Sequence, residues 1–156
     1  AVINSGRADQ IALYTGNDDN ILVDLMTEFE VQSNGEIIKK RIVGGLLGHW
    51  SVWAKEAVTL LENIKKGSYS TDSIKMLTMA AKITDSNAAF FDAANNFKGC
   101  IVGLHEVLRR QGLLEGTWTL NEKDHLSPLQ KAEIDRVYGA YPELNDDGFI
   151  AEAWLK

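Results

Sequence analysis

Two short apolar stretches near the start of the chain each end at a glycine and lead into a segment with helical periodicity. The first covers Ile11 to Thr15 and is closed by Gly16, and the second lies within Ile37 to Leu47. Short apolar runs bounded by glycine predict buried strands. Two successive strand–loop–helix units predict parallel strands of an α/β sheet or barrel, in which ligands gather where the strands end. Two such strands cannot enclose an interior alone, so we expect the chain to be part of something larger.

The rest of the chain carries apolar residues at helical spacing. A helix is predicted over residues 21–30, with Asp18, Asp19 and Asn20 as N-cap candidates, and residues 33–35 predict a turn. Further helices are predicted over residues 52–66, 71–93, 97–111 and 127–138, with a short turn or helix in 149–155. We therefore divide the chain into the last β/α units of a barrel, residues 1–66, and a C-terminal helical domain, residues 67–156.

One helix start has a specific signature. Ser127, Pro128 and Gln130 occupy the N-cap, N1 and N3 positions of the predicted helix over residues 127–138. This combination is typical of a capped helix N-terminus.

Composition narrows the class of protein. The chain has 156 residues, of which 45% are hydrophobic and 24% charged, as in an ordinary globular domain. The formal net charge of -6 argues against a surface that binds nucleic acid or an anionic membrane. A modest net charge of this kind indicates solubility and not a particular function. Cys100 is the single cysteine, which excludes an intrachain disulfide and predicts a buried small hydrophobe. No stretch has the length of a membrane span, and we expect a reducing, cytoplasmic setting.

The first candidate site is Gly16-Asn17-Asp18-Asp19, at the end of the first strand. A glycine at a strand end lets a ligand approach the backbone, and the two acids can accept hydrogen bonds from hydroxyl or amino groups. The alternative is that Asp18 and Asp19 only cap the following helix and complement its dipole.

The second candidate is the glycine-rich end of the second strand, Gly44, Gly45 and Gly48. Backbone N–H groups there suit a phosphate or carboxylate group, and the last two loops of a (β/α)8 barrel often bind phosphate. The alternative is that the glycines only permit a tight turn. No nucleotide-binding glycine spacing occurs, and His49, His105 and His125 lack metal-ligand spacing, so no cofactor or metal is expected. His49, beside Trp50, is a candidate for the mouth of a cleft, and Trp50 and Trp53 are expected to pack.

Three segments, in order, resemble one enzyme family. Tyr14-Thr-Gly-Asn-Asp18 resembles the glycine-plus-acid motif that ends the seventh strand in the dihydrodipicolinate synthase/N-acetylneuraminate lyase family. Arg41-Ile-Val-Gly-Gly45 resembles the eighth strand of that family, and Ala94 to Leu113 is similar to its C-terminal helix, which packs back under the barrel.

The resemblance implies the C-terminal part of a (β/α)8 TIM barrel, its last two strands, followed by a helical domain and assembled as a homo-tetramer. The chemistry it implies is that of a class I aldolase-type lyase or synthase acting on pyruvate or another 2-keto acid. In the family a strand-six lysine forms a Schiff base with the keto group and a strand-five tyrosine relays protons. Both would lie upstream of Ala1, so the chain would begin in mid-domain and carry none of the covalent chemistry.

The family's substrate contacts carry over to seven positions. Gly16 would hold backbone close to the substrate, and Asn17, Asp18 and Asp19 match a loop that contacts the hydroxyls of a sugar acid in the lyase branch. Val43, Gly44 and Gly45 match the strand-eight segment whose backbone faces the Schiff-base intermediate. The chain departs from the lyase branch at Gly45, where that branch has a serine, and at residues 95–98, which replace a proline-rich helix start.

Two other functions remain open at this point. A barrel enzyme could bind a phosphorylated substrate at Gly44 to Gly48. Alternatively, the chain could be a non-catalytic helical interaction module whose first fifty residues pair with a partner sheet.

Overall fold

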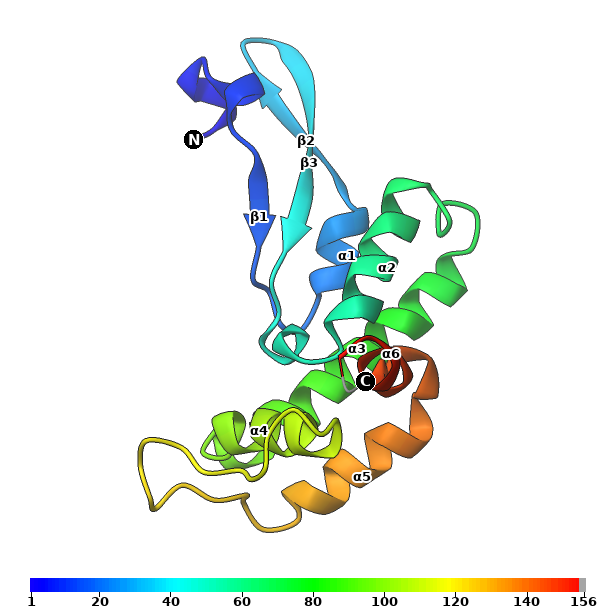
Figure 1. The fold of residues 1–156 in the computed structure, drawn as a ribbon. Coiled ribbons are helices and arrows are strands. Elements are labelled where there is room, and N and C mark those ends of the chain that lie inside the picture. Colours follow the sequence, from blue (N-terminus) through cyan, green and yellow to red (C-terminus); the bar gives the residue numbers. More distant parts are fainter. Residues whose placement is uncertain (155–156) are drawn as a thin grey trace.

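A computed structural model describes residues 1–154 as a mixed α/β fold with a small sheet at one end and helices at the other (Figure 1). The sheet has the order β1-β3-β2. Its strands are β1 (Leu13–Thr15), β2 (Glu28–Ser33) and β3 (Glu36–Gly45). The α-helices are α1 (Ile21–Met26), α2 (Ala54–Lys65), α3 (Ser73–Phe91), α4 (Cys100–Arg110), α5 (Gln130–Ala140) and α6 (Asp147–Ala153). In this part of the chain no helix combines the length and apolarity that a membrane crossing requires.

The two predicted strands form a parallel pair. β1 and β3 run in the same direction and α1 lies between them in sequence, so the predicted strand–loop–helix–strand order is confirmed. The register changes from Leu13 opposite Ile42 to Tyr14 opposite Gly44, which leaves Val43 opposite no residue of β1. Such an extra residue is a bulge, which bends the strand and disturbs the ladder locally.

The helix predicted over residues 21–30 is wrong beyond Met26. Residues 28–33 form β2, which pairs antiparallel with residues 36–41 of β3. Thr27 ends α1 in an extended conformation, and Asn34 and Gly35 both have positive φ, as a two-residue hairpin turn requires. The apolar spacing predicted a longer helix because Phe29 continues the helical interval of Leu22 and Leu25. Pairing with residues 36–41 of β3 makes this segment a strand instead.

The later helices are confirmed, with one correction at a helix start. α5 begins at Gln130, three residues after the predicted N-cap, because Leu129 has a φ of 69°. The Ser127 hydroxyl donates to the Asp92 carboxylate instead of capping the helix, although Gln130 Oε1 accepts the Ser127 N–H at 3.1 Å. Residue 155 of the last predicted segment lies outside the described residues.

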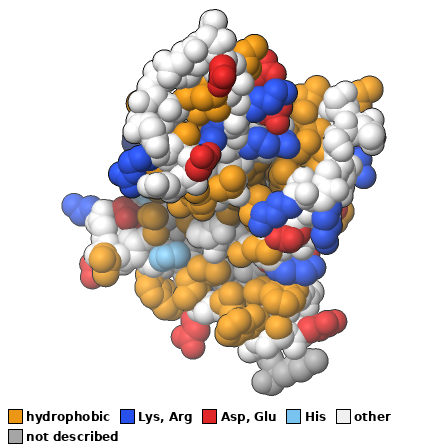
Figure 2. All heavy atoms as spheres, turned by 90° about the horizontal axis from the view of Figure 1, so that it is seen from above, with side chains coloured by type: hydrophobic (Ala, Val, Ile, Leu, Met, Phe, Trp, Pro, Cys, Tyr) orange, Lys and Arg blue, Asp and Glu red, His pale blue; other side chains and the backbone are white. Residues whose placement is uncertain are grey.

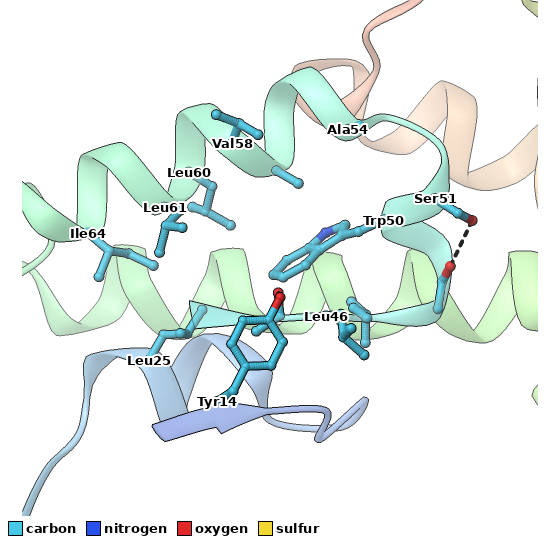
Figure 3. A pocket seen from close by; sticks show the side chains of 14 residues that line it. Tyr14, Leu25, Leu46, Trp50, Ser51, Ala54, Val58, Leu60, Leu61 and Ile64 are labelled. Carbon is cyan, nitrogen blue, oxygen red and sulfur yellow. Dashed lines mark hydrogen bonds between the residues drawn. The ribbon is translucent and has the colours of Figure 1, made fainter. Parts of the chain in front are cut away.

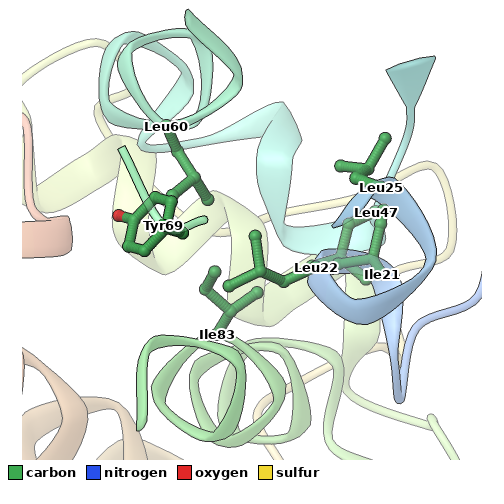
Figure 4. Packing of buried hydrophobic residues seen from close by; sticks show 7 residues of the cluster. All are labelled: Ile21, Leu22, Leu25, Leu47, Leu60, Tyr69 and Ile83. Carbon is green, nitrogen blue, oxygen red and sulfur yellow. The ribbon is translucent and has the colours of Figure 1, made fainter. Parts of the chain in front are cut away.

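Two hydrophobic clusters hold the fold together, and α3 contributes to both. The first combines α1, α2, α3 and the loops beside them (Figure 4): Ile21, Leu22, Leu25, Leu47, Leu60, Tyr69 and Ile83. The second lies among the later helices: Val52, Trp53, Ala89, Phe90, Val107, Ile134 and Val137. The first cluster draws residues from both sides of the division at residue 66. α3 therefore fixes the strand ends relative to the helical part of the chain.

Candidate functional site

The structure brings the two candidate segments together at the carboxyl ends of β1 and β3. The Leu46 N–H donates to the Thr15 carbonyl at 3.0 Å, which holds the exits of the two strands side by side. Gly16 to Asp19 leave β1 at this point and Gly44 and Gly45 end β3. Their part in binding a substrate remains a prediction.

Tyr14 covers Gly44 on the side of the sheet away from α1. A Cβ on Gly44 would lie 2.8 Å from the Tyr14 ring, and the Tyr14 hydroxyl donates to the Gly45 carbonyl at 2.9 Å. The ring is still 63% exposed. On the opposite side, a Cβ on Gly45 would lie 3.0 Å from Ile21. Tyr14 was not among the predicted site residues. An aromatic residue at a strand end, with glycines at the end of the partner strand, is the sequence pattern that could have indicated it.

The start of the loop after β1 is held by Thr15. Thr15 Oγ1 accepts the Asn17 N–H at 3.2 Å and donates to Asp24 at 2.7 Å. Asn20 is the N-cap of α1, and no side chain caps that helix. The interpretation of Asp18 and Asp19 as side-chain caps of this helix is therefore wrong. Asp18 Oδ2 lies within hydrogen-bond distance of Asn87 on α3, and the exposed Asp19 carboxylate can accept hydrogen bonds from another molecule.

The glycines at the end of β3 serve close packing. A Cβ on Gly48 would lie 2.1 Å from the ring of Phe91, so the turn η3 (Gly48–Ser51) can sit against α3 only without a side chain there. With Tyr14 packed over Gly44 and Ile21 against Gly45, this geometry favours the tight-turn interpretation over a phosphate loop.

An apolar cavity of about 610 Å³ lies between the end of β3 and one face of α2 (Figure 3). Tyr14, Leu46 and Trp50 border it on one side and Val58, Leu61 and Ile64 on the other. Its full lining is Tyr14, Leu25, Gly45, Leu46, Leu47, Gly48, Trp50, Ser51, Ala54, Ala57, Val58, Leu60, Leu61 and Ile64. Within the described residues no lysine, arginine or acid lines it, so it suits apolar groups and not a phosphate.

His49 does not line a cleft, contrary to the prediction. It is 2% exposed and lies among the rings of Trp50, Trp53 and Phe90. Its Nδ1 atom has no hydrogen-bond partner within residues 1–154, and burial lowers the pKa of His49 to about 4. Trp53 is buried, as expected of a packing residue, whereas Trp50 borders the cavity. His49 is therefore a neutral core residue at pH 7.

Charges are spread over the surface and form no metal centre. Figure 2 shows blue and red side chains interspersed with orange apolar ones over the face seen from above. Among residues 1–154 no group of three or more His, Cys, Asp or Glu side chains could hold a metal ion. Cys100 is half-buried at the start of α4, not fully buried as predicted.

Comparison of the chain with protein-family models, curated proteins and solved structures finds no match.

Proposed function

We propose that this chain supplies the substrate-side wall of the pocket in a barrel lyase that forms a Schiff base with pyruvate or another 2-keto acid. The observation that carries the proposal is the parallel pair of β1 and β3, whose carboxyl ends bring Gly16 to Asp19 beside Val43 to Gly45. In parallel α/β barrels this edge is where substrates bind. The order of the three segments that resemble the lyase family supports the same assignment.

The uncovered parts of the sheet support incorporation into a larger barrel. Among the described residues, Ile42 to Gly45 pair only with β1, and β1 pairs only with β3. β1 and the four residues at the end of β3 therefore have a free edge for a further parallel strand, whereas residues 36–41 of β3 are already paired with β2. The apolar cavity between α2 and the end of β3 could take up side chains of an adjoining strand. Tyr14, Val43 and Leu46, each more than half exposed, would be buried by this packing.

The residues of this chain would bind and orient substrate and would not react with it. The backbone at Gly16 can approach the keto acid closely, and the segment from Val43 to Gly45 would face it from the neighbouring strand end. Asp18 and Asp19 would accept hydrogen bonds from hydroxyl or ammonium groups on the distal end of the substrate. The reactive lysine and the proton-relaying tyrosine would come from the remainder of the barrel.

Borohydride trapping tests the proposal. The complete barrel protein is reduced with sodium borohydride in the presence of pyruvate, and the products are analysed by mass spectrometry after proteolysis. We expect a lysine adduct on a peptide outside residues 1–156. Absence of any lysine adduct with pyruvate or with other 2-keto acids would overturn the Schiff-base assignment.

Paired substitutions test the role of the acids. Asp18→Asn and Asp19→Asn should raise KM for the polar co-substrate or for a hydroxylated substrate, without loss of the pyruvate adduct. Asp9→Asn, an exposed acid before β1, is the matched control and should leave KM unchanged. Equal effects of all three substitutions would contradict a binding role for the loop.

A further inference from the structure

α3 carries two side chains that reach the loop after β1. Thr84 Oγ1 donates to the Asp19 carbonyl at 2.9 Å, and Asn87 Nδ2 donates to Asp18 Oδ2 at 3.4 Å. Residues three apart in a helix lie on the same face, so both contacts come from one turn of α3. The helical part of the chain therefore braces this loop from a position more than sixty residues later in the sequence.

Asn87 also holds the loop after β3. Its Oδ1 atom accepts the backbone N–H of His49 at 3.1 Å. This contact fixes which way the amide points, because a backbone N–H can only donate and must meet the oxygen. The amide nitrogen is then left to face the Asp18 carboxylate. Asn87 is 5% exposed and His49 is 2% exposed, so water does not readily replace this contact.

We infer that Asn87 is a positioning residue that ties together the two loops of the proposed substrate pocket. One amide group connects Asp18 to the segment that follows Gly44 and Gly45, and so fixes an acid at one strand end relative to the backbone of the other. The inference rests on the proposed function for the meaning of the loops, but the connection itself can be measured without any activity. A buried amide that loses its contacts leaves unpaired polar groups, which makes the connection costly to break.

Hydrogen exchange tests the connection in the 156-residue chain. Asn87→Ala should increase amide exchange by roughly tenfold in both loops, measured on peptides covering residues 16–20 and 46–52. Ser86→Ala is the matched control, because Ser86 is fully buried on the same helix but its hydroxyl donates only to the Lys82 carbonyl. It should change neither peptide. Faster exchange in one loop only, or the same increase with Ser86→Ala, would overturn the inference.

Exchanging the partners gives a second test. Asn87→Asp places a second carboxylate against Asp18 and should accelerate exchange of residues 16–20. Adding Asp18→Asn restores a donor–acceptor pair with its direction reversed, and should return exchange toward the original rate. No recovery in the double variant would overturn the direct contact.

Kinetics of the complete barrel protein test the consequence for substrate. Asn87→Ala should raise KM for the substrate that contacts the loop at least several-fold, with kcat changed less and with the borohydride-trapped adduct still formed. Ser86→Ala should leave both constants unchanged. An unchanged KM with Asn87→Ala would overturn the positioning role. If the unsubstituted protein forms no adduct, only the proposed function is overturned.

Discussion

At the scale of single residues, the surroundings of His49 change the chemistry of its imidazole. Trp50 and Trp53 face it from its own segment, and Phe90 faces it from α3. Asn87 of α3 accepts a hydrogen bond from the His49 backbone N–H. Aromatic rings surround the imidazole, and burial, which penalises its charged form, lowers the pKa of His49 more than the contact with Asn87 raises it.

This burial predicts an acid-sensitive fold. An unfolded chain takes up a proton on His49 near its ordinary pKa of 6.5, whereas the folded chain resists until about pH 4. Stability is therefore fully present above pH 6.5 and falls as pH decreases from 6.5 to 4, by up to roughly 3 kcal/mol. The measurement is the free energy of unfolding in urea at several pH values.

Two variants separate His49 from other groups. His49→Leu should abolish the loss of stability between pH 6.5 and 4.5, whereas His125→Leu, at an exposed site, should retain it. Asp85 and Glu106 have lowered pKa values because arginines bind them, so their contributions are lost only at lower pH. A pH profile that does not differ between the two variants would contradict the neutral, buried state of His49.

At the scale of elements, replacing glycine with alanine should have opposite effects on stability in η3 and in α5. Gly48 touches Phe91 of α3, where a Cβ would lie 2.1 Å from the ring. Gly139 lies exposed in the last turn of α5, with nothing within 4 Å of an added Cβ. Within a helix, glycine lowers stability relative to alanine. Where a neighbouring group fills the space beside a glycine, replacing the glycine overpacks the contact and lowers stability.

We therefore expect Gly48→Ala to lower the free energy of unfolding by about 1–3 kcal/mol and Gly139→Ala to raise it by about 0.5–1 kcal/mol. Thermal or urea unfolding of the two variants beside the unsubstituted chain measures both effects. Changes of the same sign in the free energies of unfolding would contradict the close packing of η3 against α3.

The elements also show what the sequence could predict. Local sequence patterns predicted β1, most of β3 and the later helices, because the strands are short apolar runs and the helices have apolar residues at helical spacing. β2 was missed because Phe29 fits both a helical interval and an alternating strand, although Asn34-Gly35 is a strong hairpin signal. The start of α5 was misplaced because Asp92, thirty-five residues earlier, takes the Ser127 hydroxyl.

The candidate site was predictable only in part. Gly16 to Asp19 and Gly44 to Gly45 could be brought together from strand order alone, because parallel strands end at one edge. Nothing local connects Asn87 with Asp18, and the packing of Tyr14 over Gly44 depends on the register jump at Val43. Contacts across such distances in sequence depend on tertiary packing, and helical spacing alone cannot reveal them.

At the scale of the whole molecule, one group of exposed apolar side chains lies where the sheet remains open. Tyr14, Val43 and Leu46 are exposed at the strand ends, and Val58 on α2 is 63% exposed beside the cavity. Free strand edges pair readily with other chains. Outside a complete barrel, these edges would be available for pairing between copies.

We expect the 156-residue chain to self-associate with increasing concentration, as measured by light scattering coupled to size-exclusion chromatography. Val43→Lys should reduce this association, because a lysine at a strand edge opposes edge pairing. Leu120→Lys, at a fully exposed loop position, is the control and should leave it unchanged. A chain that stays monomeric at all concentrations, or an equal effect of both substitutions, would contradict association through the open edge.

The proposed function is tested most directly by the structure of a pyruvate adduct, trapped with borohydride in a protein that joins residues 1–156 to the rest of the proposed barrel. We expect an adduct on a lysine outside residues 1–156, with its carbon chain between Gly16 to Asp19 and Val43 to Gly45. An adduct on a lysine of this chain, or one bound away from these two segments, would contradict it.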